Sequence, residues 1–342
     1  MKNDSVLISI INWNGYEKTI NCLDLIYDLD YKNFEVLVID NGSSDGIIEK
    51  IHKDYTKAKV IKNPTNIGFA GAQNQGINYA IEYCFEYIWI LNNDTLPDRY
   101  SLSHLIEEIS SDKTIGATSP VLYIRDGDNI KIQFCGSKIN WNDKIFELVE
   151  SKENAKELQR TNPELLCLWG TALLARTSLL KQIGGFDNFL FAYFEDMDLS
   201  LRIIKSGFRN SIATKSKVFH YGEADPNKRP PHYVYLNTRN RYHLWSKLIS
   251  KKERVGYLRK YLSGSILLAS SMYEKNEIDK SDAVLLGIWD AIRNKGGEWK
   301  PGRQVPRILS KAILSHPYAI INVLHGNIRK IITRFFTNRT TN

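Results

Sequence analysis

The sequence lacks several features that mark familiar classes of protein. Its four cysteines form no CxxC pair and no Cys/His cluster, which argues against a zinc knuckle or a disulfide framework. The apolar runs near the C-terminus fall far short of the roughly twenty residues that cross a bilayer. The opening stretch, MKNDSVLISIINWNG, has no basic region followed by a long apolar run and a small-residue cleavage site. We therefore expect no secretory signal and a cytoplasmic protein.

Basic residues are scarce in the first two thirds of the chain. Residues 1–229 carry 26 Lys and Arg against 31 Asp and Glu, whereas residues 230–342 carry 20 against 7. Residues 224–231, rich in Pro, Asp and Lys, separate the two parts. We expect a catalytic domain over residues 1–229 and a basic helical region over residues 230–342.

The basic region could contact an anionic membrane surface or an oligomer partner, or could only present a solvated face; no nucleic-acid partner is expected. On a membrane the protein would be peripheral, at the inner face of the cytoplasmic membrane. The oligomeric state cannot be derived from the sequence. The side chains expected at such a surface are Trp245, Lys251, Lys252, Arg254, Tyr257, Arg329, Lys330, Arg334, Phe335 and Phe336.

Apolar strands alternate with amphipathic helices along the first hundred residues. Strands are expected at residues 6–11, 34–39, 60–61 and 87–91, with helices after them, including residues 47–51, 69–83 and 99–109. This alternation predicts an α/β fold with a doubly wound, mostly parallel sheet. Short β-like pieces between residues 116 and 146 predict a small mixed or antiparallel β layer, and the spacing beyond residue 231 predicts a C-terminal helical extension.

Three later segments carry further expectations. Residues 151–164 are charged and poor in apolar residues, which predicts an exposed loop. Residues 166–174 predict one buried strand, and residues 195–205 predict a helix.

Each of the first four strands delivers a polar side chain to its carboxyl end, where ligands bind in open α/β sheets. These side chains are Asn12, Asp40, Asn66 and Asp94. None of the strands is followed by a GxGxxG turn or by the GKS/T of a phosphate loop. The pattern predicts a site that recognises a polar ligand through side chains, with a carboxylate placed to hold a cation.

Three clusters could carry chemistry, and each could instead be a helix cap. The segment that begins at Asp40 has the small polar residues and the carboxylate that suit a base and a ribose. Asp94 could bind a hard divalent cation, because a diphosphate can supply the remaining oxygen ligands. Glu195, Asp196 and Asp198 crowd the first turn of a helix, and crowding raises the pKa values of carboxyl groups, as a general base requires.

Five segments resemble, in order and context, the inverting family-two glycosyltransferases of the GT-A fold. They are Ile10–Gly15 (IINWNG), Ile39–Gly46 (IDNGSSDG), Asn66–Gly71 (NIGFAG), Leu91–Asp94 (LNND) and Phe194–Leu199 (FEDMDL). The likeness spans about residues 5–223. It is strongest to the branch that includes rhamnosyltransferases and galactofuranosyltransferases of cell-surface glycans.

The resemblance implies a role for each matching residue. The donor site would comprise Asn12, Asn14, Asp40, Asn41, Ser43, Asn66, Gly68, Phe69, Asn74, Asn92 and Asn93. Asp94 and His220 would bind Mg²⁺ or Mn²⁺, Asp196 would be the catalytic base with Glu195 beside it, and Trp169, Gly170 and Thr171 would line the acceptor side. Asn92 stands where many members of the family have the first Asp of the DxD motif, which puts the strength of metal binding in doubt.

The expected function is metal-dependent, inverting transfer of a sugar, rhamnose or another hexose, in cell-surface polysaccharide synthesis. The donor would be a dTDP- or UDP-linked sugar and the acceptor a glycan or a lipid-linked glycan. A nucleotidyltransferase is an alternative, although residues 12–15 lack the basic residue of a triphosphate loop. A catalytically weak domain that binds nucleotide sugar or glycan is another.

Overall fold

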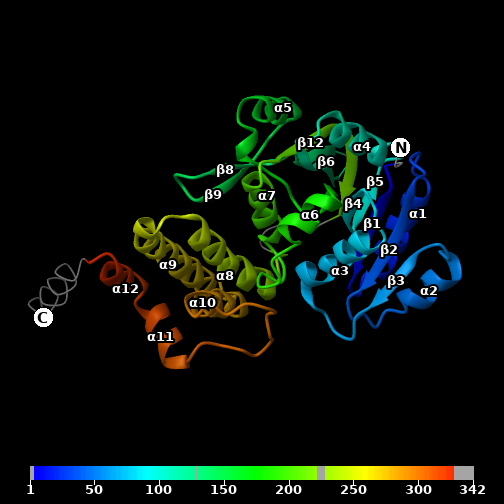
Figure 1. The fold of residues 1–342 in the computed structure, drawn as a ribbon. Coiled ribbons are helices and arrows are strands. Elements are labelled where there is room, and N and C mark those ends of the chain that lie inside the picture. The colour runs from blue at the N-terminus through cyan, green and yellow to red at the C-terminus, as the bar shows by residue number, and fades with distance from the viewer. Residues whose placement is uncertain (1–3, 128, 222–227, 327–342) are drawn as a thin grey trace, which may run out of the picture. The chain divides into compact units, whose positions relative to one another are not determined.

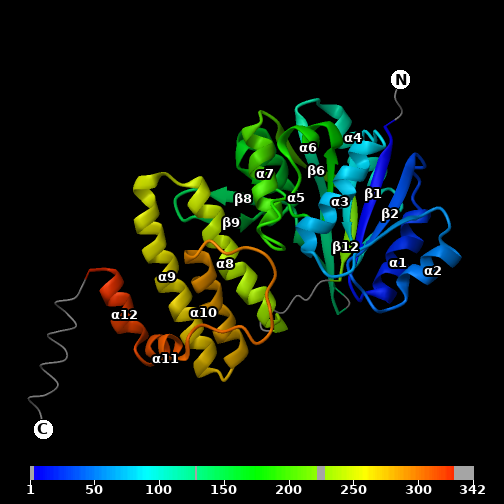
Figure 2. The same cartoon turned by 60° about the horizontal axis from the view of Figure 1, so that its bottom comes forward.

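The first half of the main sheet is parallel, as the alternation of strands and helices predicts (Figure 1). The computed structural model describes residues 4–127, 129–221 and 228–326. The elements of this half are β1 (Val6–Asn12), α1 (Tyr16–Tyr27), β2 (Phe34–Asp40), α2 (Ile47–Asp54), β3 (Lys59–Lys62), α3 (Gly68–Glu82) and β4 (Tyr87–Asn92). In Figures 1 and 2, α3 lies on one side of β1 and β2, and α1 lies on the other. The doubly wound arrangement is therefore confirmed.

The register of the parallel strands gathers their polar ends. In β1, Asn12 is paired with Asp40 of β2, and Ile11 is paired with Asn92 of β4. The apolar residues that precede these ends are almost all fully buried, including Trp89 of β4. Burial on both faces fixes the strands, so the polar residues emerge together at one edge.

The second half of the sheet is mixed. Its elements are β5 (Thr95–Pro97), α4 (Ser101–Ser111), β6 (Ile115–Asp126), β7 (Asn129–Phe134), β11 (Ala172–Arg176), α6 (Thr177–Ile183), α7 (Glu195–Lys205) and β12 (Arg209–His220). The strand order is β3-β2-β1-β4-β11-β6-β12-β5, and β7 pairs with β6. Strand β11 runs antiparallel to β4 and β6, whereas β12 runs parallel to β6.

A small antiparallel sheet stands apart from the main one. It consists of β8 (Ser137–Asn140), β9 (Ile145–Leu148) and β10 (Leu166–Cys167), in the order β10-β8-β9. The prediction of one strand over residues 166–174 is therefore wrong. Residues 168–171 are not in a strand, and the chain passes there from the small sheet (β10) to the main sheet (β11).

The loop expected over residues 151–164 is also wrong. This segment forms α5 (Lys152–Thr161) and the short 3₁₀ helix η1 (Pro163–Leu165). The Ser151 hydroxyl caps α5 by accepting a hydrogen bond from the Asn154 N–H. Ala155 and Leu158 are the residues of α5 that are buried in the core. A cap and two apolar residues one turn apart are enough to hold a charged helix on the protein.

The C-terminal unit, which covers residues 223–342, is helical in its described part. Its helices are α8 (Pro231–Leu248), α9 (Lys251–Glu274), α10 (Ile278–Ile292), α11 (Arg307–Ser315) and α12 (Pro317–Leu324). Trp245 is fully buried and Tyr257 is only 9% exposed, so neither is free to enter a membrane interface as expected. The basic and aromatic residues named between 329 and 336 lie outside the described residues. No described helix combines the length and the apolar character that a bilayer crossing requires.

Candidate functional site

Asn12 is the hub of the polar edge. Its side-chain amide donates to Ser43 Oγ at 2.9 Å, to Asp45 Oδ2 at 3.2 Å and to Asp40 Oδ1 at 3.4 Å. The side-chain oxygen of Asn12, Oδ1, accepts a hydrogen bond of 2.7 Å from the Thr19 hydroxyl. Asn12 is fully buried, so its side chain does not reach solvent. Its hydrogen bonds hold the loop after β2 in place.

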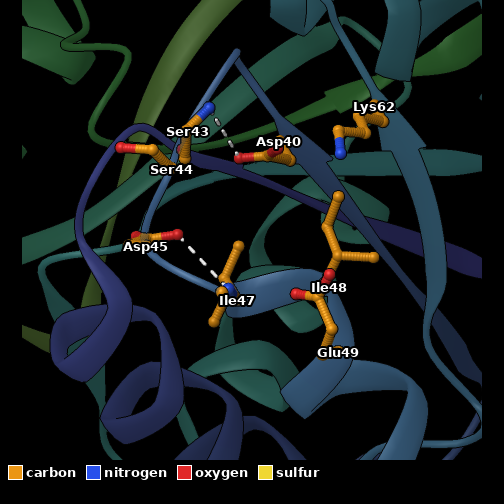
Figure 3. Close-up of a pocket in the computed structure, with 9 residues that line it drawn as sticks. Asp40, Ser43, Ser44, Asp45, Ile47, Ile48, Glu49 and Lys62 are labelled. Atoms are coloured by element: carbon orange, nitrogen blue, oxygen red, sulfur yellow. Dashed lines mark hydrogen bonds between the residues drawn. The ribbon is translucent and has the colours of Figure 1, made fainter.

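A pocket of about 280 Å³ opens between the ends of β2 and β3 and the start of α2 (Figure 3). It is lined by Asp40, Ser43, Ser44, Asp45, Gly46, Ile47, Ile48, Glu49 and Lys62. Asp40 and Ser43 were expected in a donor site, but Lys62 was missed. Its position could have been found from sheet register, because Lys62 is paired with Asp40 across β2 and β3.

Asn14 closes the rim of the same loop. Its backbone N–H donates to Ser43 Oγ at 3.0 Å, and its side-chain oxygen accepts from the Ser44 N–H at 3.0 Å. The loops after β1 and β2 are therefore tied together directly beside the pocket.

Asn41 and Asn66, which were expected to face the donor, use their side chains to hold a loop. The Asn41 amide donates to Asn66 Oδ1 at 2.9 Å, and its oxygen accepts from Asn63 Nδ2 and from the Ile67 N–H, each at 3.1 Å. Asn66 Oδ1 also accepts from the Gly68 N–H at 2.8 Å. This network fixes the turn that begins α3.

Asn74 joins α3 to the backbone of Phe186 by two hydrogen bonds. Its amide group donates to the Phe186 carbonyl at 2.9 Å, and its oxygen accepts from the Phe186 N–H at 2.7 Å. Phe69 packs edge-on against Phe186, with ring centroids 5.4 Å apart. Both residues of α3 thus brace the segment that precedes α7.

The two asparagines before Asp94 differ in their surroundings. The Asn93 amide turns to the loop after β1 and donates to the Thr19 hydroxyl at 2.9 Å. The backbone N–H of Asn92 donates to the Thr171 carbonyl at 2.9 Å, and its carbonyl accepts from the Thr95 hydroxyl at 2.6 Å. Asn92 therefore joins the end of β4 to Thr171, the residue directly before β11.

Asp94 and His220 meet although 126 positions separate them in the chain. Strand β5 pairs with the end of β12 so that His220 is opposite Thr95, and His220 Nε2 lies 3.3 Å from Asp94 Oδ1. Lys18 of α1 is 3.8 Å from the other carboxylate oxygen. Burial of Asp94 opposes its charge, but the hydrogen bond and charge of His220 and the charge of Lys18 prevail, so its pKa is lowered. Asp94 is thus ionised at neutral pH.

The donor atoms of Asp94 and His220 fit a divalent cation. Two ligands at right angles on one octahedral ion, each about 2.1 Å from it, lie about 3 Å apart. Among the described residues, no group of three or more His, Cys, Asp or Glu could enclose a metal ion. A cation held here would therefore need further oxygen ligands from a bound molecule or from water, as Mg²⁺ commonly does at phosphate sites.

The start of α7 holds two acidic side chains in different surroundings. Asp196 Oδ2 accepts from the Gly170 N–H at 3.1 Å, and Oδ1 accepts from the Met197 N–H at 2.8 Å. Burial raises the pKa of Asp196, and these backbone hydrogen bonds oppose part of the rise. Glu195 is buried, and its Oε2 has no hydrogen-bond partner among the described residues. Burial, and then the charge of Asp196, raise the pKa of Glu195 well above its ordinary range.

Asp198 has a structural partner instead. Its carboxylate accepts a hydrogen bond of 2.7 Å from Arg202 Nε, and the same guanidinium donates to the carbonyls of residues 183–185. Of the three carboxylates in this turn, Asp198 therefore secures the end of α6.

Backbone contacts place Asp94 and Asp196 at the same end of the β4–β11 pair. Asn92 is bonded to Thr171, and the preceding Gly170 is bonded to Asp196. Trp169 stacks on Phe134 with ring centroids 4.4 Å apart, so its ring supports this corner from behind. The Asp94–His220 pair, the start of α7 and the expected acceptor-side residues are thus joined by consecutive contacts.

Gly68 controls the approach to α7. The segment before the helix contains three non-glycine residues with left-handed backbone, namely Phe191, Tyr193 and Phe194. The Phe191 carbonyl accepts from the Ala70 N–H at 3.0 Å, and a Cβ on Gly68 would lie 2.6 Å from that carbonyl oxygen. A side chain at residue 68 would push this strained segment away from α3.

We expect Gly68→Ala to destabilise the fold by more than the roughly 1–2 kcal/mol of left-handed strain alone. The matched control is Gly207→Ala, since Gly207 also has a positive φ but has open space around the added Cβ. Denaturant unfolding measures both variants. Equal losses of unfolding free energy would show that the contact with Phe191 has no energetic weight.

The family model Glycosyl transferase family 2 matches residues 5–184. An N-acetylglucosaminyl-diphospho-decaprenol L-rhamnosyltransferase of Mycobacterium tuberculosis is 24% identical over 271 aligned positions, and the match covers 72% of this chain and 85% of that protein. A low-salt glycan biosynthesis hexosyltransferase of Haloferax volcanii is 23% identical over 88% of this chain and 94% of its own.

A solved structure has the same fold. It is a mannosyltransferase from Pyrobaculum calidifontis in complex with GDP-Man and Mn²⁺, with a TM-score of 0.54 and 16% identity. The match covers 85% of this chain and 87% of that chain. The expected GT-A fold is therefore confirmed.

Proposed function

We propose that this chain, which belongs to glycosyl transferase family 2 and so transfers sugars, is a metal-dependent inverting hexosyltransferase. It would move rhamnose or another hexose from a dTDP- or UDP-linked donor to a hydroxyl of a glycan or lipid-linked glycan. The observation that carries the proposal is the alignment of three features along one edge of the sheet. These are the pocket at Asp40, the Asp94–His220 pair and the carboxylate of Asp196.

The pocket at the end of β2 suits the nucleoside of the donor. A volume of about 280 Å³ accommodates a base with part of its ribose, and the lining offers both acceptors and the ammonium group of Lys62. Asp40 can accept a hydrogen bond from a ring N–H, and Ser43 and Ser44 can reach ribose hydroxyls. The diphosphate would then extend from this pocket toward Asp94.

Asp196 would act as the general base. Its carboxylate takes the proton of the acceptor hydroxyl as that oxygen forms a bond to the anomeric carbon. The bond from that carbon to the diphosphate oxygen breaks on the opposite face, and its electron pair leaves with the nucleoside diphosphate. The configuration at the anomeric carbon is therefore inverted.

Hydrogen bonds from the Gly170 and Met197 N–H groups orient the Asp196 carboxylate. Its raised pKa makes it a stronger base than an exposed aspartate. The buried Glu195 carboxyl, with its pKa raised further, adds little negative charge beside it while protonated.

Asp94 and His220 would hold Mg²⁺ or Mn²⁺ together with the donor's diphosphate. The cation, when bound, offsets the negative charge that grows on the departing diphosphate. Lys18, 3.8 Å from Asp94, adds a positive charge at the same place. The presence of Mn²⁺ together with GDP-Man in the solved structure of the Pyrobaculum mannosyltransferase supports this choice of ion.

The acceptor would enter beside Gly170 and Thr171, which flank the base. The relative from Mycobacterium tuberculosis is named for a diphospho-decaprenol acceptor, which supports a lipid-linked acceptor here. The synthesis of a cell-surface polysaccharide would use such a product.

A panel of nucleotide sugars tests the proposal. Incubation with each donor and a lipid-linked glycan should release nucleoside diphosphate from one donor and add one hexose to the acceptor, as read by mass spectrometry. Release of pyrophosphate would favour the nucleotidyltransferase alternative. Tight donor binding without release across the panel would favour a domain that only binds nucleotide sugar.

Helices α11 and α12 support a membrane surface for the C-terminal unit. Neither helix has a buried residue, Ile308 is 88% exposed and Tyr318 is 71% exposed. The basic residues Arg307 and Lys311 are exposed on α11, which has no acidic residue. Such a surface would hold the enzyme at the inner face of the cytoplasmic membrane, where lipid-linked acceptors lie.

We expect the full chain to co-sediment with phosphatidylglycerol vesicles but not with phosphatidylcholine vesicles. Replacing Arg307 and Lys311 with serine should weaken the partition about fivefold for each charge, from about 1 kcal/mol per basic residue. Ile308→Glu should also weaken it. The matched control is Ile130→Glu on β7, where Ile130 is 56% exposed. If the Ile308 and Ile130 variants sediment alike, α11 is not the contact.

A further inference from the structure

Gln133 occupies a bulge in β7. Strand β6 pairs Leu122 with Phe134 and Tyr123 with Ile132, so two consecutive residues of β6 face three residues of β7. Gln133 is the extra residue. A bulge turns the side chain of its extra residue out of the regular alternation, and such bulges recur beside active sites.

The bulge aims Gln133 at His220. Gln133 Oε1 lies 2.8 Å from His220 Nδ1, and both side chains are partly buried. The next residue, Phe134, is buried and stacks on Trp169, which anchors the strand at this point. The amide is therefore delivered to the imidazole from a fixed backbone.

This contact links the position of the His220 ring proton to the orientation of the Gln133 amide. With Oε1 facing the ring, Nδ1 carries the hydrogen and donates it to Gln133, because a carbonyl oxygen can only accept. In the neutral ring, Nε2 then presents a lone pair toward Asp94 Oδ1, which is 3.3 Å away and is also an acceptor. Two acceptors that face each other at this distance need a positive centre between them. A proton supplies it in the hydrogen bond that lowers the pKa of Asp94, and a divalent cation can take the place of that proton.

We propose that Gln133 is a positioning residue that holds His220 in the Nδ1–H tautomer, with Nε2 directed at the cation shared with Asp94. The inference rests on the proposed metal role of His220. Metal-bound histidines generally donate their other N–H to a carboxylate or carbonyl, and loss of that partner typically costs about 10–100-fold in metal affinity or activity. No sequence motif marks Gln133, since its place depends on the bulge.

Mn²⁺ affinity, measured by calorimetry on the full chain with and without UDP, tests this without reference to turnover. Gln133→Leu removes the acceptor and should weaken Mn²⁺ binding about 10-fold or more. Gln133→Glu keeps an acceptor for the Nδ1–H. Its Mn²⁺ affinity should therefore be close to that of the unmodified protein. Ile130→Thr, on the same strand, is the control and should bind normally.

A double-mutant cycle with His220→Ala isolates the pair. Once the imidazole is gone, Gln133→Leu should cause no further loss of Mn²⁺ affinity. Nitrogen-15 NMR of histidine-labelled protein, with His220 assigned from the His220→Ala variant, should show the Nδ1–H form in the unmodified chain and a loss of that preference in Gln133→Leu. Thermal unfolding identifies any variant whose fold is lost.

The outcomes separate this inference from the proposed function. If His220→Ala weakens Mn²⁺ binding but folded Gln133→Leu binds normally, Gln133 does not position the ligand and the metal site stands. If His220→Ala binds Mn²⁺ normally, both the metal role of His220 and this inference are overturned. An Nε2–H tautomer in the unmodified protein would overturn the inference alone, because the amide would then donate to Nδ1.

Discussion

Asp196→Asn lowers turnover by about 10²–10⁴-fold while donor binding persists, if Asp196 is the general base. An amide cannot take the proton of the acceptor hydroxyl at neutral pH. The substitution keeps the volume of the side chain and one of its two acceptor atoms, so the hydrogen bond to either Gly170 or Met197 can remain. Steady-state kinetics give the turnover, and calorimetry with the nucleoside diphosphate gives the donor affinity. Turnover within a fewfold of normal in a folded variant would remove Asp196 from this role.

The pH profile provides an independent check on the same carboxylate. Burial raises the pKa of Asp196, so the base becomes protonated at a higher pH than an exposed aspartate. The acid limb of kcat/KM should therefore lie above the ordinary carboxyl range of about 4. It should disappear from the residual activity of Asp196→Asn.

The raised pKa also has a consequence for stability. A carboxyl whose pKa is higher in the folded state than in the unfolded state favours folding while it is protonated. This contribution is lost as pH rises from the unfolded value through the folded value. Glu195 and Asp196 both have raised pKa values, so the fold should lose stability over the interval above about pH 4. Glu195→Gln should reduce that loss in unfolding experiments at different pH values.

Asp94→Asn is expected to lower turnover about 10²-fold or more and to weaken Mn²⁺ binding. The reason is that the cation supplies several kcal/mol of charge stabilisation, and Asp94 is its only carboxylate ligand in the proposed site. A chelator should abolish the activity of the unmodified enzyme, and added Mn²⁺ should restore it. The lowered pKa of Asp94 predicts that the ligand stays ionised across the working pH range. Full activity after chelation would refute the metal role of Asp94.

The control for Asp94 is Asp112, which contacts the opposite end of strand β12. Asp112 is bonded to Arg209 at 2.8 Å, where β12 begins, whereas His220 ends that strand. Asp112→Asn removes a carboxylate of similar charge from the opposite edge of the sheet. It should leave both turnover and Mn²⁺ affinity unchanged.

Sequence reasoning was most successful where pattern and chemistry coincide. Apolar runs bounded by Asn or Asp located β1, β2 and β4 to within a residue, because burial on both faces leaves few alternatives. The acidic turn at Glu195 was recognised as the start of a helix because the first turn of a helix favours negatively charged side chains. The resemblance, in turn, paired Asp94 with His220, which no periodicity could have done.

Sequence reasoning failed where a tertiary contact decides the local structure. Helix α5 was missed because its average composition is polar, and only Ala155 and Leu158 face the core. There was also no sign in the sequence of the hydrogen bonds that Asn41, Asn66 and Asn74 make within the fold, to one another and to neighbouring backbone, and their place in a donor site stays a prediction. Gln133 gave no signal, since its place depends on a bulge, and Lys62 could be found only from the register between β2 and β3.

The hydrogen bond between Asn92 and Thr171 joins two backbone groups. In the bond between Gly170 and Asp196, the donor is the backbone N–H of Gly170. Peptide groups are present whatever the side chains are, so the spacing between Asp94 and Asp196 tolerates broad divergence in sequence. The pocket near Asp40, in contrast, is lined by side chains such as Ser44, Glu49 and Lys62. If this pocket holds the nucleoside of the donor, as proposed, substitutions there change which nucleotide is accepted while the distance between Asp94 and Asp196 stays constant. Donor preference and the chemistry of transfer would then evolve on separate parts of this fold.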